Sequence, residues 1–261
     1  MPEGDTIYRT ADTLRRWLGG REITRASASA GGVDAARLIG LRVESVEARA
    51  KHLLVRFSNG LCLHTHQGMT GAWHVYAAGA RWQKPAHQAR VVLEAGDRVA
   101  VCFSAPVVEL LSAEGAGRQH SLAHLGPDVL VEPLDLVEVR RRADFRPTDM
   151  SIGELLLDQQ VVSGIGNVYR CEALFLCQLH PWSPRSALDV AAFDGVVETA
   201  SKLMRANVGG PGRPRDLGRG PGQHWVYGRT GRPCRRCRTL IRSSALAGRR
   251  VYWCPGCQAA T

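Results

Sequence analysis

The chain has 261 residues, which is enough for two domains of ordinary size, each with its own core. Its formal net charge of +10 comes from one end of the chain: residues 205–261 hold 12 Arg against one Asp, whereas the preceding residues are close to neutral. No apolar run approaches the roughly 20 residues of a membrane-spanning helix, and the N-terminus has no basic-then-apolar leader. These features argue against a membrane protein or a secreted protein and predict a cytoplasmic location.

The chain begins Met1-Pro2-Glu3-Gly4, and removal of the initiator methionine would leave the secondary amine of Pro2 at the terminus. An α-amino group titrates near ~8, so a useful fraction is unprotonated at neutral pH and is able to attack an aldehyde-level carbon to give an iminium. Most termini of this kind are simply solvated, however. A retained Met1 would also make the Pro2 nitrogen a tertiary amide and exclude this chemistry.

The first half of the chain combines one helical pattern with several strand patterns. Residues 5–18 place apolar side chains at helical spacing and stop at a Gly-Gly pair, which predicts a helix. Strand-like apolar runs follow at 53–57, 61–63, 90–93 and 98–101, with turns at 59–60 and 96–97. We therefore expect residues 1–130 to form a mostly antiparallel β-sandwich with an N-terminal helix.

Two segments within this half carry side chains suited to chemistry or binding. Lys51 precedes a predicted strand; a lysine there is usually a solvated edge residue, and a functional role requires it to lie near Pro2. Another strand leads into the glycine-flanked segment His64-Thr65-His66-Gln67-Gly68-Met69-Thr70-Gly71. An exposed Met69 on such a loop would be able to wedge between bases, although a loop methionine more often folds back onto the core.

The second half begins with a turn, Leu125-Gly126-Pro127-Asp128, and an expected linker at 131–148. Ser151 and Glu154 then have capping-box spacing, and a Gly-x-Gly turn separates two helical patterns. Backbone N–H groups at such a helix start suit a phosphate, but the same turn also fits a plain corner between helices. We assign residues 149–222 to a helical domain, with a helix over 189–207 and a Gly/Pro/Arg-rich loop at 208–222 that we expect to be mobile.

The basic C-terminal segment, residues 223–261, has the pattern of a zinc finger. Cys234-x2-Cys237 and Cys254-x2-Cys257 are separated by 16 residues, the spacing of two thiolate pairs that share one tetrahedral Zn²⁺. Four thiolates complete the coordination sphere, so the metal is expected to be structural. The interval between the pairs is long enough for a β-hairpin with two arginines on its returning strand. A localised positive charge attracts a polyanion, and nucleic acid is the first candidate.

Together these motifs resemble the formamidopyrimidine-DNA glycosylase/endonuclease VIII family over the whole length of the chain. The segments that carry the resemblance are Met1-Pro2-Glu3-Gly4, Lys51, His66-Gln67-Gly68-Met69-Thr70-Gly71, Leu125-Gly126-Pro127-Asp128, Ser163-Gly164-Ile165-Gly166-Asn167-Val168-Tyr169, Val226-Tyr227-Gly228-Arg229 and Tyr252-Trp253-Cys254-Pro255-Gly256-Cys257-Gln258. The resemblance implies an α+β fold made of a β-sandwich, a helix–two-turn–helix domain and a zinc finger. The implied partner is damaged DNA, duplex or single-stranded.

The resemblance also implies roles for individual residues in base excision repair. Pro2 would attack C1′ of a damaged nucleotide flipped out of the duplex, with Glu3 as acid or base. Lys51 would assist β-elimination, and Arg249 would assist δ-elimination. The residues implied to contact DNA are His66, Gln67, Met69, His124, Asn167 and Arg170, with Met69 filling the space left by the flipped nucleotide. The implied metal is one structural Zn²⁺ on Cys234, Cys237, Cys254 and Cys257, and no dissociable cofactor is expected.

The branch of the family is less sharply marked. Gly4 and Ser104-Ala105-Pro106-Val107 resemble endonuclease VIII, which implies oxidised pyrimidines as substrates, whereas Gly68-Met69 resembles the 8-oxoguanine-type loop. Thr6 stands where the family usually has an acid, and His124 where some members carry an arginine. The leading hypothesis is a bifunctional DNA glycosylase/AP lyase, a monomer associated with the nucleoid. The alternatives are a formamidopyrimidine-type glycosylase and a damaged-DNA-binding protein without catalysis, and the amine at the terminus argues against the second.

Overall fold

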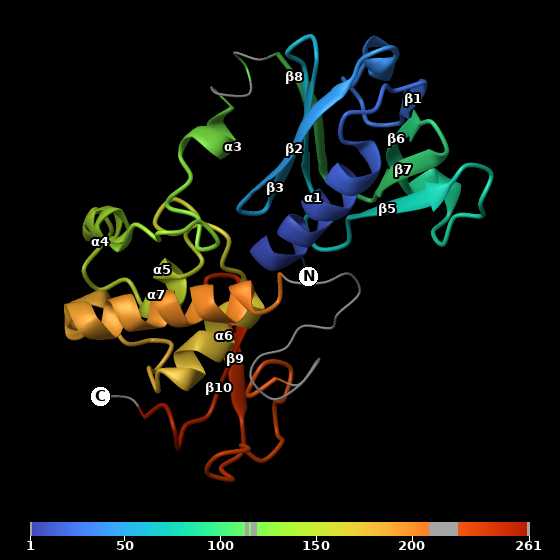
Figure 1. Ribbon diagram of the computed structural model, residues 1–261. Helices are drawn as coiled ribbons and strands as arrows, with labels where there is room; N and C mark the ends of the chain where they lie inside the picture. Colours follow the sequence, from blue (N-terminus) through green and yellow to red (C-terminus); the bar gives the residue numbers. More distant parts are fainter. Residues whose placement is uncertain (1, 113–114, 116–118, 209–223, 260–261) are drawn as a thin grey trace. The chain divides into compact units, whose positions relative to one another are not determined.

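The computed structural model describes residues 2–112, 115, 119–208 and 224–259, so most of the loop expected at 208–222 lies outside the described residues, as does Met1. The chain divides into two compact units, residues 1–124 and residues 125–261 (Figure 1). Among the described residues there is no helix with the length and apolar character needed to span a membrane.

The N-terminal unit is built from one long helix and two four-stranded antiparallel sheets. The helix is α1 (Gly4–Leu18), which confirms the helix expected over 5–18. One sheet has the strand order β1–β6–β7–β5 and the other has the order β2–β3–β4–β8. The strands are β1 (Arg25–Ala28), β2 (Val43–Arg49), β3 (His52–Phe57), β4 (Cys62–His66), β5 (Ala72–Ala77), β6 (Ala89–Ala95), β7 (Arg98–Phe103) and β8 (Val107–Leu111). The short helices given by the described residues of this unit include η1 (Ala35–Leu38), η2 (Ala86–Gln88) and α3 (His120–Ala123).

The two sheets and α1 share one apolar core. Leu53, Val55 and Phe57 of β3 are fully buried in it, as expected for alternate residues of a strand that places one face on a core. The apolar stripe of α1 is buried in the same cluster. Because each fully buried side chain of this kind contributes about 2 kcal/mol, the stripe fixes the start of α1, and with it the first residues of the chain, on the sandwich.

The C-terminal unit contains a helical part and a β-hairpin (Figure 1). The helices are α4 (Leu136–Asp144), α5 (Ile152–Leu155), α6 (Asn167–Leu176), η3 (Arg185–Ala187) and α7 (Val190–Arg205), and the antiparallel strands of the hairpin are β9 (Arg242–Leu246) and β10 (Arg249–Trp253). The expected capping box of Ser151 and Glu154 begins α5, and the helix expected over 189–207 is α7. The three predicted parts of the fold are therefore confirmed.

Helix α4 lies within the interval 131–148, for which the sequence favours a linker. Asp135 caps its first turn by accepting a hydrogen bond from the N–H of Glu138. Within this helix Val139 and Ala143 are buried, and they belong to the core of the helical part. Two buried residues among several charged ones form too narrow an apolar stripe for a helix to be recognised from spacing alone.

The β-hairpin is anchored to α6. Glu172 of α6 is fully buried, and its carboxylate accepts hydrogen bonds from the N–H groups of Trp225, Val226 and Tyr227 at 2.6, 3.0 and 2.8 Å. Near the end of the chain, the amide of Gln258 donates to a backbone carbonyl of the helical part at 2.8 Å. The segments on both sides of the hairpin are therefore tied to the helices, and β10 packs on α6.

Candidate functional site

Pro2 and Glu3 immediately precede α1. Glu3 occupies the N-cap position, and its carbonyl oxygen accepts hydrogen bonds from the N–H groups of Thr6 and Ile7 at 2.9 and 3.1 Å. Glu3 is fully buried, and a carboxylate beside a helix N-terminus is stabilised by the helix dipole. Pro2 is half-buried. Pro2, the implied nucleophile, is therefore followed directly by the buried Glu3, and α1 holds both residues in place on the β-sandwich.

Met69 lies on a tight loop whose form depends on glycine. The N–H of Gly71 donates to the carbonyl of Gln67 at 2.8 Å, and the N–H of Gly68 donates to Nδ1 of His66 at 3.2 Å. Gly68 has a φ of +58°, and a Cβ at this position would lie 2.7 Å from a proline ring, so a side chain there would displace the loop. Met69 is 75% exposed and does not fold back onto the core.

Two side chains hold this loop from its flanks. Gln67 is 2% exposed, and its Nε2 donates to the hydroxyl of Thr10 on α1 at 3.4 Å. Lys84 donates to the carbonyl of Thr70 at 3.3 Å. Gln67, implied by the resemblance to contact DNA, therefore anchors the loop to α1, and Met69 is the side chain that the loop presents to solvent.

A row of polar side chains crosses the outer face of the sheet β2–β3–β4–β8. Nδ1 of His52 and Nε2 of His64 are 2.8 Å apart, and Nδ1 of His64 lies 3.0 Å from Oε2 of Glu109. The ring of His52 also packs against that of His66, with the ring centroids 4.9 Å apart. Lys51, the implied elimination residue, immediately precedes His52 at the start of β3. The row therefore ends beside a residue of the candidate site.

The pKa of His52 is lowered from 6.5 to about 3, first because the ring is buried and then because of the charges of His66, His64, Lys51 and Arg49. His52 is consequently neutral at physiological pH. The sequence motifs assign no role to His52, His64 or Glu109. The signal that would find them is their register. His52 lies opposite His66 within the hairpin of β3 and β4, whereas His64 lies opposite Glu109 of β8, and this pairing of strands distant in sequence is known only from the fold.

Asn167 and Arg170 lie on the first turn of α6 and contact each other. Nη2 of Arg170 donates to Oδ1 of Asn167 at 2.6 Å, and Nδ2 of Asn167 donates to the carbonyl of Arg250 on β10 at 2.8 Å. Arg170 has no exposed surface, and Asn167 is 6% exposed. The structure therefore brings these two implied DNA contacts together, but it buries both and uses Asn167 to hold the hairpin.

Arg249 and Arg250 begin β10, and both are exposed. Adjacent residues of a strand point to opposite faces, so the side chains of Arg249 and Arg250 lie on opposite faces of the hairpin. Arg249 pairs in register with Leu246 across the turn. In the N-terminal unit, His124 is exposed at the end of α3.

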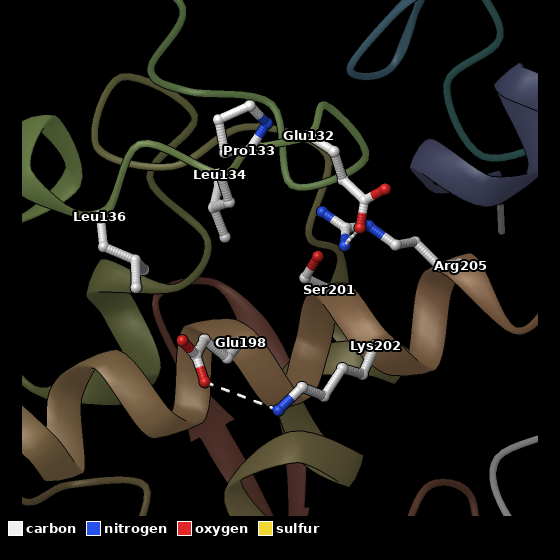
Figure 2. Close-up of a pocket in the computed structure, with 8 residues that line it drawn as sticks. All are labelled: Glu132, Pro133, Leu134, Leu136, Glu198, Ser201, Lys202 and Arg205. Carbon is white, nitrogen blue, oxygen red and sulfur yellow. Dashed lines mark hydrogen bonds and ion pairs between the residues drawn. The ribbon is translucent and has the colours of Figure 1, made fainter.

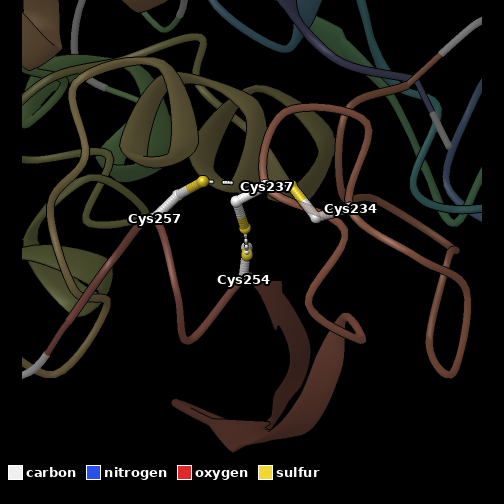
Figure 3. A group of neighbouring side chains, drawn as sticks. All are labelled: Cys234, Cys237, Cys254 and Cys257. Atoms are coloured by element: carbon white, nitrogen blue, oxygen red, sulfur yellow. Dashed lines mark hydrogen bonds between the residues drawn. The ribbon is translucent and has the colours of Figure 1, made fainter.

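The four cysteines form a compact cluster at the base of the hairpin (Figure 3). Their Sγ atoms all lie within 4.8 Å of one another, with 3.9 Å between Cys234 and Cys257 and 3.3 Å between Cys237 and Cys254. Hydrogen bonds from Thr239 lower the pKa of Cys237 to about 6, whereas burial raises the pKa of Cys254 and Cys257, so a bound cation is needed to hold all of them as thiolates. A tetrahedron with Zn–S bonds of about 2.3 Å has edges of about 3.8 Å, so the spacing and the soft donor set fit a thiolate-bound metal ion.

The C-terminal unit also contains a cavity of about 440 Å³ between residues 132–136 and α7 (Figure 2). Its charged lining residues are paired with one another, Arg205 with Glu132 and Lys202 with Glu198. Ser201 donates to a backbone carbonyl. The polar groups of this cavity are thus engaged in holding α7, and we do not count it in the candidate site.

Comparisons with known proteins agree with this arrangement. Residues 1–106 match the sequence model described as the formamidopyrimidine-DNA glycosylase N-terminal domain, and residues 125–213 match that described as the formamidopyrimidine-DNA glycosylase H2TH domain. A Streptomyces coelicolor protein named probable endonuclease 8 2 is 41% identical, over 99% of this chain and 94% of that protein. The DNA-(apurinic or apyrimidinic site) lyase Nei2 of Mycolicibacterium smegmatis is 35% identical over 100% of both chains.

A solved structure shares the fold. The complex of Lactococcus lactis Fpg (MutM) with DNA containing N7-benzyl-Fapy-dG matches with a TM-score of 0.84, covering 99% of this chain and 100% of that chain. The sequence identity is 22%, so this likeness concerns the fold alone.

Proposed function

Since the chain belongs to the formamidopyrimidine-DNA glycosylase/endonuclease VIII family, we infer that it is a DNA-repair glycosylase and AP lyase, and we propose that its nucleophile is the amine of Pro2. The observation that carries the proposal is the position of Pro2 directly before the buried Glu3, at the head of a helix that is itself fixed in the core. A protein that only binds damaged DNA has no need of an amine and an acid at this place.

The chemistry follows from the amine. The nitrogen of Pro2 attacks C1′ of the damaged nucleotide while the bond from C1′ to the base breaks, and the departing base takes its electron pair and a proton that Glu3 helps to deliver. The nitrogen then loses its proton, and protonation of O4′ with breakage of the C1′–O4′ bond opens the sugar ring to give the iminium, which makes the C2′ proton acidic. Loss of this proton, assisted by Lys51, breaks the C3′–O bond in the β-elimination step. Loss of a second proton, assisted by Arg249, breaks the C5′–O bond in the δ-elimination step.

The DNA contacts proposed for this chain fall into two groups. Met69, His124 and Arg249 are exposed, and we propose that they meet DNA directly, with Met69 taking the place of the flipped nucleotide. His66 is half-buried and joins them as a phosphate contact. Gln67 and Arg170 are buried and act indirectly, through the loop that carries Met69 and through Asn167, which holds the hairpin strand that begins with Arg249.

For the metal we propose one Zn²⁺ held by Cys234, Cys237, Cys254 and Cys257. When bound, the ion supplies four bonds that stabilise the fold of the hairpin, and with four protein ligands it leaves no position for water. Gly256 permits this packing, because a Cβ there would lie 2.6 Å from the hydroxyl of Thr239. We further propose that the protein acts as a monomer and associates with nucleoid DNA.

Oxidised pyrimidines are the proposed substrates, in line with the relatives named endonuclease 8. A panel of duplexes carrying thymine glycol, 5-hydroxyuracil, dihydrouracil or 8-oxoguanine tests this assignment. Faster excision of 8-oxoguanine than of the three pyrimidines would place the protein with the formamidopyrimidine-type enzymes instead.

The nucleophile is tested by trapping. Borohydride reduces an iminium, so its addition during the reaction is expected to leave a covalent protein–DNA adduct whose cross-linked peptide begins at Pro2. An uncleaved extra residue before Pro2 is expected to abolish the adduct, whereas Pro2→Gly retains weak trapping through a primary amine. A cross-link on Lys51 would overturn the assignment, and the absence of any adduct with abasic DNA would favour a protein that only binds damage.

A further inference from the structure

We propose that the base of the finger carries a docking groove for an acidic segment of a partner protein, with one apolar side chain of that segment as its anchor. The groove has a volume of about 710 Å³, and we call it the finger groove. Its lining includes Leu240, Ile241, Arg242, Trp253 and Pro255. The proposal goes beyond the proposed function, because it concerns a protein partner and no step of the reaction on DNA.

The finger groove lies at the opposite end of the hairpin from the proposed phosphate contact. Arg242, which lines the groove, pairs in register with Trp253 at the base, whereas Leu246 pairs with Arg249 at the turn. From one pair to the other the strand advances by four residues, and at about 3.4 Å per residue the two pairs are roughly 14 Å apart. The groove and Arg249 are therefore two separate places on the finger.

Apolar side chains form the walls of the finger groove. Leu240 is 57% exposed, and the side chains of Trp253 and Pro255 line the groove with it. The ring of Trp253 is held in place by Trp182, with the ring centroids 4.8 Å apart and the rings at 72°. The backbone of Leu240 is fixed by a bridge to Pro233. The walls are thus formed before a partner binds, which reduces the entropy lost on binding.

The surroundings of the finger groove are positively charged. Residues 224–261 contain eight arginines and no aspartate or glutamate. Arg242 lines the groove, and Arg232 is held beside it because its carbonyl accepts a hydrogen bond from the N–H of Ile241 at 3.0 Å. Within the part of the chain that the structure describes, neither of these two guanidinium groups makes a hydrogen bond or an ion pair. Both charges are therefore available to the carboxylates of a partner.

The combination of charge with an apolar groove favours a protein segment over DNA. A phosphate backbone would satisfy the arginines, but it has no apolar side chain to place against Leu240. An unpaired base needs an aromatic face on which to stack, and the ring of Trp253 is already packed against Trp182 and His180. An extended peptide with several carboxylates and one large apolar side chain matches both features of the surface.

The test uses the full chain with its metal bound and a fluorescein-labelled synthetic peptide in which aspartates surround one phenylalanine. Fluorescence anisotropy measures the affinity, and a second peptide with serine in place of phenylalanine isolates the contribution of the anchor. The variants are Leu240→Ser, which removes the exposed apolar side chain, and Arg242→Gln, which removes one charge. The matched controls for peptide binding are Val137→Ser, at an exposed valine of α4, and Arg250→Gln, near the turn of the hairpin.

We expect Leu240→Ser and Arg242→Gln each to weaken binding of the phenylalanine peptide by about tenfold, as expected for the loss of one central contact. The two control variants are expected to bind this peptide like the wild-type protein, and the serine peptide is expected not to distinguish Leu240→Ser from wild type. Affinity for abasic duplex and the rate of strand cleavage are expected to stay unchanged in Leu240→Ser and Arg242→Gln. A failure of the reaction proposed for Pro2 would therefore leave this test unaffected.

Several results would overturn the docking groove. Absence of binding of the phenylalanine peptide to the wild-type protein would do so, and equal affinity of wild type and Leu240→Ser would show that general charge alone attracts the peptide. A loss of duplex affinity in Arg242→Gln as large as that in Arg249→Ala would assign the groove to DNA. Displacement of the bound peptide by abasic duplex would lead to the same conclusion, whereas simultaneous binding of both supports the proposal. If Leu240→Ser fails to fold, the comparison of the two peptides on wild type and Arg242→Gln still decides.

Discussion

The side-chain oxygen of Asn167 lies 2.6 Å from a guanidinium nitrogen of Arg170, one turn farther along α6. The same Asn167 donates its amide hydrogen to the carbonyl of Arg250, so the orientation set by Arg170 decides how α6 holds the first strand residues of the finger. Arg249, the proposed phosphate contact, is the neighbour of the residue so held. The side-chain amide of Asn167 therefore links the fully buried Arg170 to the strand segment that carries the exposed Arg249.

Arg170→Ala is expected to lower the free energy of unfolding by about 3 kcal/mol, because it opens a cavity and leaves Asn167 and the carbonyl of Gly153 without their donor. Urea denaturation monitored by tryptophan fluorescence measures the loss. Arg238→Ala, at an exposed arginine of the finger, is the control and is expected to change stability little. A loss below about 1 kcal/mol in Arg170→Ala would mean that the buried contact is not structural.

Met69→Ala is expected to impair base excision from an intact pair more than strand cleavage at a preformed abasic site. A side chain that fills the space of a flipped nucleotide has less to do when no base has to leave the stack. Single-turnover rates on the two substrates give the comparison. Since Met69 is 75% exposed, its loss should leave thermal stability unchanged. Equal impairment on both substrates would point to a role in the form of the loop.

Arg249→Ala is expected to weaken binding to different DNA sequences alike and to reduce the slope of log K against log salt by about 1, as expected for one phosphate contact. Arg250→Ala is the matched comparison, since it lies on the other face of the same strand and is held by its backbone rather than its side chain. Titrations at several salt concentrations distinguish the two. The same loss in both variants would indicate general positive charge in place of a specific contact.

His52 makes stability depend on pH. Its pKa is about 3 in the folded chain and 6.5 as the ordinary value, so the unfolded chain binds a proton more readily below 6.5. The folded state therefore loses stability as the pH falls from 6.5 towards 3, by about 2 kcal/mol at pH 5, and has no such loss above 6.5. His52→Asn is expected to be less sensitive over this window, as measured by urea denaturation at pH 5 and 7.5. Parallel curves for the two proteins would contradict the assignment.

Cys237→Ser is expected to lower the bound zinc and the affinity for DNA, because the hairpin depends on the thiolate cluster for its form. The N-terminal unit has its own core and should keep its fold. Cys177→Ser is the control, since Cys177 lies against the hydroxyl of Thr199 and outside the cluster. Metal analysis that finds no zinc in the wild-type protein would refute the assignment of the ion.

Features that depend on local spacing were predicted well from the sequence. The helix α1, four of the strands, the capping box of Ser151 and the four-cysteine cluster each follow from a pattern within a short stretch of chain. Helix α4 was not predicted, because Val139 and Ala143 are too few to reveal a buried face.

Features that depend on pairing or burial could not be predicted. The row from His52 through His64 to Glu109 exists because β4 pairs both with its neighbour β3 and with β8, which is distant in sequence, and no periodicity within one strand reveals the second pairing. Gln67 and Arg170 are polar residues for which an exposed contact is the natural expectation, but the structure buries both. A sequence motif therefore indicates which residues are functional. It does not show whether each of them contacts DNA directly or acts by holding a neighbouring residue in place.

The three hydrogen bonds accepted by Glu172 give the finger an attachment that does not depend on its cysteines. A chelator that opens the cluster would leave the amides of Trp225, Val226 and Tyr227 held, and these would stay protected from hydrogen exchange while the hairpin beyond them opens. When the metal binds again, the chain is already held in place shortly before Cys234, and this reduces the conformational entropy lost when the four cysteines come together. Loss of metal would thus be a local and readily reversible event, confined to the part of the finger beyond Tyr227.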